Sequence, residues 1–240
     1  MAVSAPRIGF DHFIKGEWAA SALNVRAGLA SREELSNVLD AEKLGKAARK
    51  KTQTVLNRLW LEPLPDLVEF ADRGAAILRA EPSTPTFVLS WGMAIATYSF
   101  FGKVAELVGR LALLQGDCTS PEIHRRMSEI YGEREGTYRM TNMVLQTQQD
   151  WKAIDRVGAE KRVIANKVAE LSDENLIQWL IEAALRYYRK PLQVSAIEAL
   201  PVIYPITFRH SVSYASSKSE HLIMISDGHG QQSVALDQKS

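Results

Sequence analysis

Apolar side chains recur at three- and four-residue intervals through most of the first 150 residues, a period typical of amphipathic helices. Proline and glycine residues interrupt this pattern and place most of the expected helix ends. Ser31 and Glu34 predict a capping box at the start of the second helix. Ser120 and Pro121 predict the N-cap and first turn of a later one. The predicted helices cover residues 10–27, 31–40, 46–61, 67–79, 86–101, 103–115, 120–131 and 136–150.

The pattern changes after Trp151, where two short β-prone segments, AIDRV and KRVIAN, are separated by GAE. Two such runs around a glycine-containing link predict a β-hairpin. A helix over residues 174–188 follows, capped by Ser172 and Asp173 and ended by Pro191. HLIMIS and QSVALD then flank DGHG and predict a second hairpin. We therefore predict a mainly α fold: a helical bundle with helix-turn-helix elements, one of them winged-helix-like, plus small β-hairpins.

This order of elements suggests three parts of the chain. Residues 1–81 would form an N-terminal helical subdomain with a basic helix-turn-helix, and residues 82–210 a helical subdomain with the winged-helix-like unit. Residues 211–240 would form a C-terminal hairpin and tail. Residues 82–102 carry no charge, but the mostly apolar run at 87–101 is 15 residues long, short of the ~20 that cross a bilayer. We expect a buried core helix there and no membrane partner.

Composition places the chain among ordinary globular proteins, because 46% of its 240 residues are hydrophobic and 24% are charged. The single cysteine, Cys118, excludes a disulfide within the chain and a cysteine-based zinc site. That usage suits a reducing compartment. The first 20 residues contain Asp11 and Glu17 and lack the apolar stretch of a signal peptide. We therefore expect a cytoplasmic protein.

The formal net charge is only +1, so any surface that binds nucleic acid must be local. Residues 41–60 hold six basic side chains and one acid, Glu42, which is the strongest charge asymmetry in the chain. This helix follows the one at 31–40 through a short glycine-containing link, which is helix-turn-helix order. Such a helix can neutralise several phosphates, whereas the alternative is a basic helix that only faces solvent. Its predicted phosphate contacts are Lys46, Arg49, Lys50 and Lys51.

Residues 103–167 have the order helix, helix, tight turn, longer helix, hairpin, which is the order of a winged helix. In that fold the third helix enters the major groove and the hairpin lies over the backbone. Arginine pairs with guanine, and asparagine and glutamine pair with adenine, through two hydrogen bonds each. The predicted base contacts are Arg139, Asn142 and Gln146. The predicted phosphate and wing contacts are Arg134, Thr137, Arg156, Lys161 and Arg162.

Two other interpretations of this unit stay open. Its polar stripe can be a solvated helix face, because residues 121–140 hold four basic and four acidic side chains. Winged helices in large assemblies also bind protein instead of DNA. An exposed apolar patch, or acids covering the third helix, would favour such a protein-binding scaffold.

Enzymatic function has little support in the sequence. The five histidines are scattered, without a metal-binding spacing, and neither a P-loop nor a G-x-G-x-x-G motif is present. DGHG lacks the strand-then-helix context of a phosphate loop and is better explained as a turn. Cys118 follows a predicted helix end with no evident base beside it. We expect a protein that is not an enzyme and that uses no cofactor or metal.

A resemblance to a known family rests on the order of several motifs across residues 8–208. An amphipathic N-terminal helix is followed by a basic helix ending in NRLW, then LSWGMAIATYSFF, VAELVGRLALLQG, IYGER and a helix that closes on Trp151. This series resembles the BrxA family of bacteriophage-exclusion (BREX) defence systems. The resemblance implies a mostly helical, non-enzymatic protein that binds double-stranded DNA and works with other phage-defence proteins. The alternatives are an interaction scaffold of a multi-protein complex or a helical RNA-binding protein.

Overall fold

The N-terminal third of the chain folds as helices packed on one another, as the apolar period predicts. The computed structural model describes residues 9–226 and 230–237. The first elements are α1 (Gly16–Ala27), α2 (Arg32–Ala41), α3 (Lys46–Leu56), the π-helical turn η1 (Asn57–Leu61), η2 (Pro65–Leu67), α4 (Val68–Ala80) and α5 (Thr86–Thr97). Ser31 and Glu34 form the predicted capping box at the start of α2. The mainly α fold with small β elements is confirmed.

The middle of the chain forms a winged helix. Its elements are α6 (Ser99–Gln115), β1 (Cys118–Thr119), α7 (Ser120–Tyr131), α8 (Glu135–Asp150), β2 (Ile154–Val157) and β3 (Arg162–Ala165). The three strands are antiparallel in the order β1-β3-β2, with Cys118 opposite Val163. Gly132, at φ 87°, makes the turn between α7 and α8. The predicted hairpin after Trp151 is therefore the wing of this unit, and β1 is an additional strand.

The C-terminal part carries two more small sheets. Its elements are β4 (Ala169–Leu171), α9 (Glu174–Tyr188), β5 (Leu192–Gln193), α10 (Val194–Ile197), η3 (Pro201–Ile203), β6 (Ile206–Phe208), α11 (Val212–Ser217), β7 (Leu222–Ser226) and β8 (Gln232–Leu236). β4 pairs with β6 in parallel, and the other sheet is antiparallel in the order β5-β8-β7. The strands of the second predicted hairpin are present, whereas most of its DGHG link lies outside the described residues.

Several element boundaries differ from the predictions, two of them at contacts distant in sequence. The first helix begins at Gly16 instead of Phe10, and the Asp150 carboxylate accepts a hydrogen bond from its first N–H at 2.7 Å. Residues 86–101 are not one helix, because the backbone leaves helical geometry at Tyr98, whose hydroxyl donates to the Val55 carbonyl. Thr119, not Ser120, caps α7.

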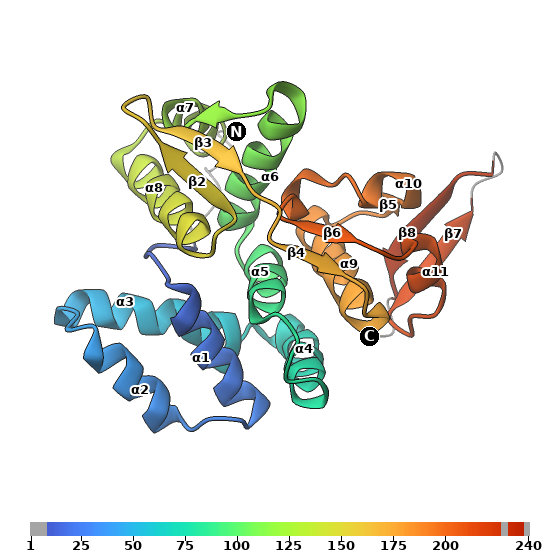
Figure 1. Ribbon diagram of the computed structural model, residues 1–240, viewed down its shortest axis with the longest axis horizontal. Coiled ribbons are helices and arrows are strands. Elements are labelled where there is room, and N and C mark those ends of the chain that lie inside the picture. Colours follow the sequence, from blue (N-terminus) through green and yellow to red (C-terminus); the bar gives the residue numbers. More distant parts are fainter. Residues whose placement is uncertain (1–8, 227–229, 238–240) are drawn as a thin grey trace, which may run out of the picture.

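One continuous core joins all three parts, and α5 lies at its centre (Figure 1). Trp179 of α9 stacks on Phe70 of α4 with ring centroids 4.3 Å apart. Glycine is needed where this indole crosses α4 and α5, because a Cβ at Gly92 would lie 2.4 Å from the ring. No helix within the described ranges is long and apolar enough to cross a membrane.

Candidate nucleic-acid interface

The predicted recognition helix α8 is amphipathic, with an apolar inner face and a polar outer face as expected. Its inner face buries Met140, Val144 and Leu145. Its outer face presents Arg139, which is exposed, while Asn142 and Gln146 are half-buried beside it. α8 and α3 lie on the same side of the molecule, at the left in Figure 1, and the hairpin β7–β8 lies on the opposite side.

Thr137 is the one predicted contact that the structure contradicts. Its side chain is fully buried, so the prediction that it reaches phosphate is wrong. The reason is helical geometry: Thr137 lies one turn before Thr141 on the inward face, and its carbonyl accepts a hydrogen bond from the Thr141 hydroxyl at 2.8 Å. Arg134, its neighbour at the start of α8, remains exposed.

Ion pairs on α7 and at the wing explain the balanced charge of this region. Arg126 pairs with Glu122 at 3.1 Å, and Arg125 pairs with Glu129, one turn apart on the same helix. Arg162 is exposed as predicted, but it pairs with Asp117, which raises the pKa of its guanidinium. Two of the four acids in residues 121–140 are therefore paired on α7, whereas Glu133 and Glu135 are exposed at the start of α8 and make no ion pair among the described residues.

The remaining cations of the unit have no acidic partner among the described residues. They are Arg134, Arg139, Lys152, Arg156 and Lys161. Arg156 is half-buried on β2, and Lys161 is exposed in the turn of the wing at φ 54°. Arg134 and Arg139 lie at the start and on the outer face of α8, and Arg156 and Lys161 lie on the wing. Positive charge is therefore present on the recognition helix and on the wing, the two parts of a winged helix that contact DNA.

An aromatic pair that was not predicted from the sequence lies between α7 and α8. Tyr138 of α8 is 57% exposed and stacks on His124 of α7, with ring centroids 4.0 Å apart. Burial and the charges of Arg156 and Lys161 lower the pKa of His124 to about 4, so this ring is neutral at pH 7. The available signal was a tyrosine beside Arg139 at the edge of a polar stripe, since a large exposed ring next to cations suits nucleic-acid contact.

The basic helix α3 keeps three of its four predicted contacts free. Lys46, Lys50 and Lys51 are exposed, and their ammonium groups make no ion pair among the described residues. Arg49 instead pairs with Asp40 at 2.8 Å and donates to the Ser36 hydroxyl at 2.9 Å, which ties α3 to α2. These bonds give Arg49 a structural role, and its predicted phosphate contact stays a prediction.

The single acid of this basic segment is neutralised from outside it. Both Glu42 carboxylate oxygens accept from the Lys15 ammonium at 2.7 Å, and this pairing lowers the pKa of the Glu42 carboxyl. The lysines of α3 thus keep their full positive charge, which the segment's own sequence does not reveal.

A short segment joins the two units. Residues 10–15 run between α3 and the end of α8, where the Ile14 amide donates to the Thr147 hydroxyl at 3.0 Å. The Trp151 indole N–H donates back to the Ile14 carbonyl at 3.0 Å. Together with the contact of Asp150 to Gly16, these bonds tie the N-terminal helices to α8.

Two features of the described ranges concern metal and thiol chemistry. No cluster of three or more His, Cys, Asp or Glu side chains there can hold a metal ion. Cys118 is buried, and its burial raises the pKa of the thiol to about 12, so it is not a thiolate at neutral pH.

Comparison with protein-family models, with curated proteins and with solved structures finds no match to this chain. The interpretation of the site therefore depends on its geometry and charge.

Proposed function

We propose that this protein binds double-stranded DNA, without catalysing a reaction, as an accessory component of bacterial phage defence. One observation supports DNA binding above the others. The winged helix pairs its arginines on α7 with acids and leaves Arg134, Arg139, Arg156 and Lys161 unpaired among the described residues. Unpaired cations on both the recognition helix and the wing suit a phosphate-lined groove.

In the proposed complex, α8 lies in the major groove. Arg139 would reach a guanine edge, and Asn142 and Gln146 would reach adenine where the groove approaches them. The DNA backbone would run beside the wing, in contact with Arg156, Lys161 and the exposed Tyr138 ring. Lys46, Lys50 and Lys51 would add sequence-independent phosphate contacts on the same side of the molecule (Figure 1).

A gel-shift titration with a duplex of about 30 base pairs at low salt tests DNA binding. We expect binding at micromolar protein that weakens steeply towards physiological salt. Complete absence of a shift under these conditions would sink the proposal. Competition between duplex DNA and RNA of the same sequence separates DNA binding from RNA binding, because a helix shaped for the major groove of B-DNA does not fit the narrow one of A-form RNA.

The defence role is supported only by the resemblance of the sequence to the BrxA family. Its test is the neighbourhood of the gene. Adjacent genes for a methyltransferase and a large ATPase would support the role, and a neighbourhood without them would count against it.

A further inference from the structure

The edge of the C-terminal sheet lacks the usual protection against pairing with another chain. β7 has the sequence LIMIS, and it is the outer strand of the order β5-β8-β7. Edge strands in natural proteins are commonly blocked by a charged residue, a proline or a bulge. β7 contains neither charge nor proline, and its register with β8 is unbroken from Leu222 to Ser226.

The register identifies which backbone groups face outwards. The Asp237 amide donates to the His221 carbonyl, so His221, Ile223 and Ile225 occupy hydrogen-bonded positions towards β8. The N–H and C=O groups of Leu222, Met224 and Ser226 must then point away from the sheet. Nothing within the described ranges hydrogen-bonds to them. An extended segment can therefore add to this edge as a further strand.

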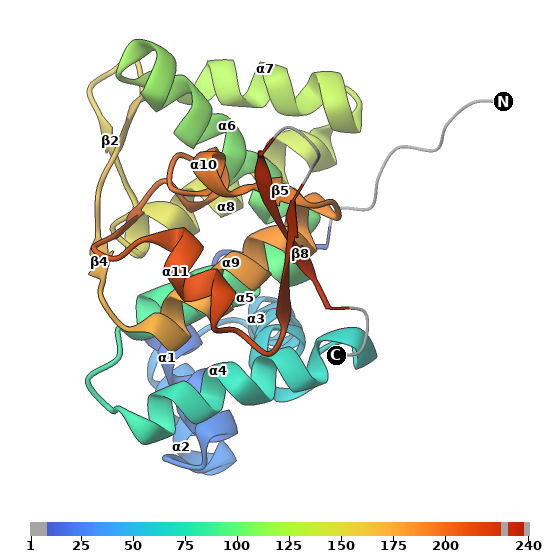
Figure 2. The same cartoon turned by 90° about the vertical axis from the view of Figure 1, so that its right-hand side faces the viewer.

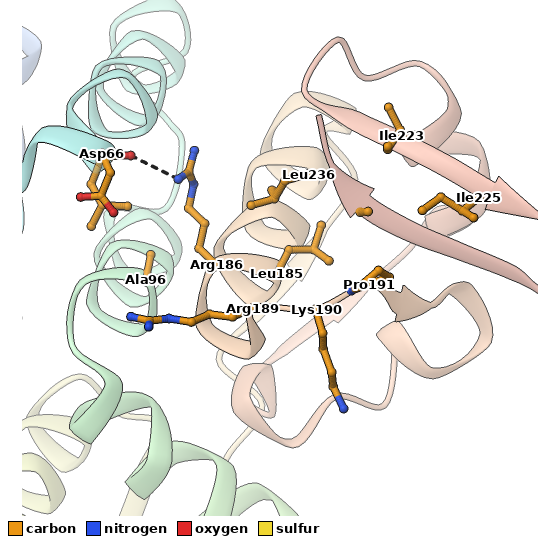
Figure 3. A pocket seen from close by; sticks show the side chains of 12 residues that line it. Asp66, Ala96, Leu185, Arg186, Arg189, Lys190, Pro191, Ile223, Ile225 and Leu236 are labelled. Carbon is orange, nitrogen blue, oxygen red and sulfur yellow. Dashed lines mark hydrogen bonds between the residues drawn. The ribbon is translucent and has the colours of Figure 1, made fainter. Parts of the chain in front are cut away.

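One face of β7 also borders a cavity of about 680 Å³. Ile223 and Ile225 are 41% and 42% exposed and line it together with Leu185 and Leu236 (Figure 3). A cavity of this size accommodates several side chains. An added strand would place alternate side chains on this face, beside the two isoleucines.

Positive charge lines the same cavity at the end of α9. Arg186 is held by the Glu182 carboxylate at 2.8 Å and donates to the Asp66 carbonyl. Arg189 and Lys190 have no ion pair among the described residues, and Figure 3 shows Arg189 extending towards Ala96. Among the described residues, Asp66 is the one acid that lines the cavity, so this lining favours an anionic guest.

We propose that β7 is a docking edge for an extended segment of a partner protein, whose backbone pairs with β7 and whose acidic side chains reach Arg189 and Lys190. Apolar side chains of the segment pack against Ile223 and Ile225. The hairpin faces the viewer in Figure 2, with α3 behind it, so docking leaves the proposed DNA-binding face uncovered.

The test uses two fluorescein-labelled peptides as probes, one alternating valine with glutamate and one alternating valine with lysine. Fluorescence anisotropy with the full chain should show binding of the glutamate peptide at least about tenfold tighter than that of the lysine peptide. The net charge of the whole chain is only +1, so overall charge does not produce such a preference.

Two kinds of variant separate edge pairing from charge. Met224→Pro removes an N–H that points away from the sheet and leaves the hydrogen bonds to β8 intact. Ile225→Lys places a charge, of the kind that commonly protects an edge strand, at an exposed position of β7. Either variant should weaken binding of the glutamate peptide about tenfold or more. Arg189→Glu with Lys190→Glu should do the same. Lys43→Glu with Lys152→Glu makes the same change in charge at exposed positions away from the cavity, and it should leave binding of the glutamate peptide unchanged.

Equal binding of both peptides, binding of neither at millimolar concentration, or binding unaffected by Met224→Pro and Ile225→Lys would overturn the proposal. Self-association of the wild type in sedimentation, abolished by Met224→Pro, would overturn it in favour of pairing between two copies. The Arg189→Glu, Lys190→Glu variant should retain its DNA gel shift, so failure of this proposal is distinguishable from failure of DNA binding.

Discussion

The helix-turn-helix of α2 and α3 and the winged helix of α6–α8 place cations on the same side of the molecule by different means. α3 concentrates Lys46, Lys50 and Lys51, and Glu42, the one acid of residues 41–60, is neutralised by Lys15. The winged helix holds as many acids as bases over residues 121–140; two of the acids, Glu122 and Glu129, are paired on α7, and the other two, Glu133 and Glu135, are exposed at the start of α8. A count of charges therefore separates the two units, whereas both contain cations that make no ion pair among the described residues. We infer that α3 supplies affinity and α8 supplies selection.

The largest expected effect comes from removing the lysines of α3. Lys46→Ala, Lys50→Ala and Lys51→Ala together should lower duplex affinity at low salt by roughly a hundredfold and reduce the salt slope by about 3, because each neutralised phosphate contributes about 0.9. Titrations at several salt concentrations measure both values. An unchanged slope would mean that the phosphate contacts lie elsewhere and that α3 does not supply the affinity.

Arg139→Ala should have a smaller but sequence-dependent effect. Loss of a two-bond contact to guanine costs roughly 1–3 kcal/mol and relaxes preference at one base pair. Selection of bound duplexes from a random pool measures that preference. Arg125→Ala is the matched control, because Arg125 is exposed on the neighbouring helix but is paired with Glu129. A preference that Arg139→Ala leaves intact would argue that α8 does not select sequence.

Arg49→Ala should act on stability and not on binding. It removes the ion pair with Asp40 and the hydrogen bond to Ser36, which costs about 1 kcal/mol of unfolding free energy. Urea denaturation measures this loss. The salt slope for DNA should stay at the wild-type value, and a slope reduced by about 1 would instead show that Arg49 contacts phosphate.

The smallest effect concerns pH and is confined to the winged helix. The pKa of His124 is about 4 in the folded state, below its ordinary value near 6.5, so the unfolded chain binds the proton more readily. Its contribution to stability is complete above about pH 6.5 and is lost as the pH falls towards 4. His124→Gln should flatten the dependence of melting temperature on pH in that window. An equally steep dependence in the variant would mean that other groups cause it.

Much of the winged helix could be predicted from the sequence, because its signals are local. The hairpin after Trp151, the turn at Gly132 and the exposure of Arg139 follow from residues within a few positions of each other. Thr137 was misplaced because a polar side chain on an amphipathic helix was assumed to face outwards. Tyr138 was missed because its partner, His124, lies on another helix. The parallel pairing of β4 with β6 joins segments more than 30 residues apart and has no local signature.

What the sequence by itself determined is most of the long helices, the capping box at Ser31 and the position of the basic segment. Helical period, the capping box at Ser31 and glycine at a left-handed turn act over a few residues, so they can be recognised in the linear chain. Only the tertiary structure decided which charges remain available, because an ion pair such as that of Lys15 with Glu42 or Arg162 with Asp117 joins residues far apart in sequence. The electrostatic field outside the protein depends on those pairs, and so does the distinction between a neutral surface and a binding one.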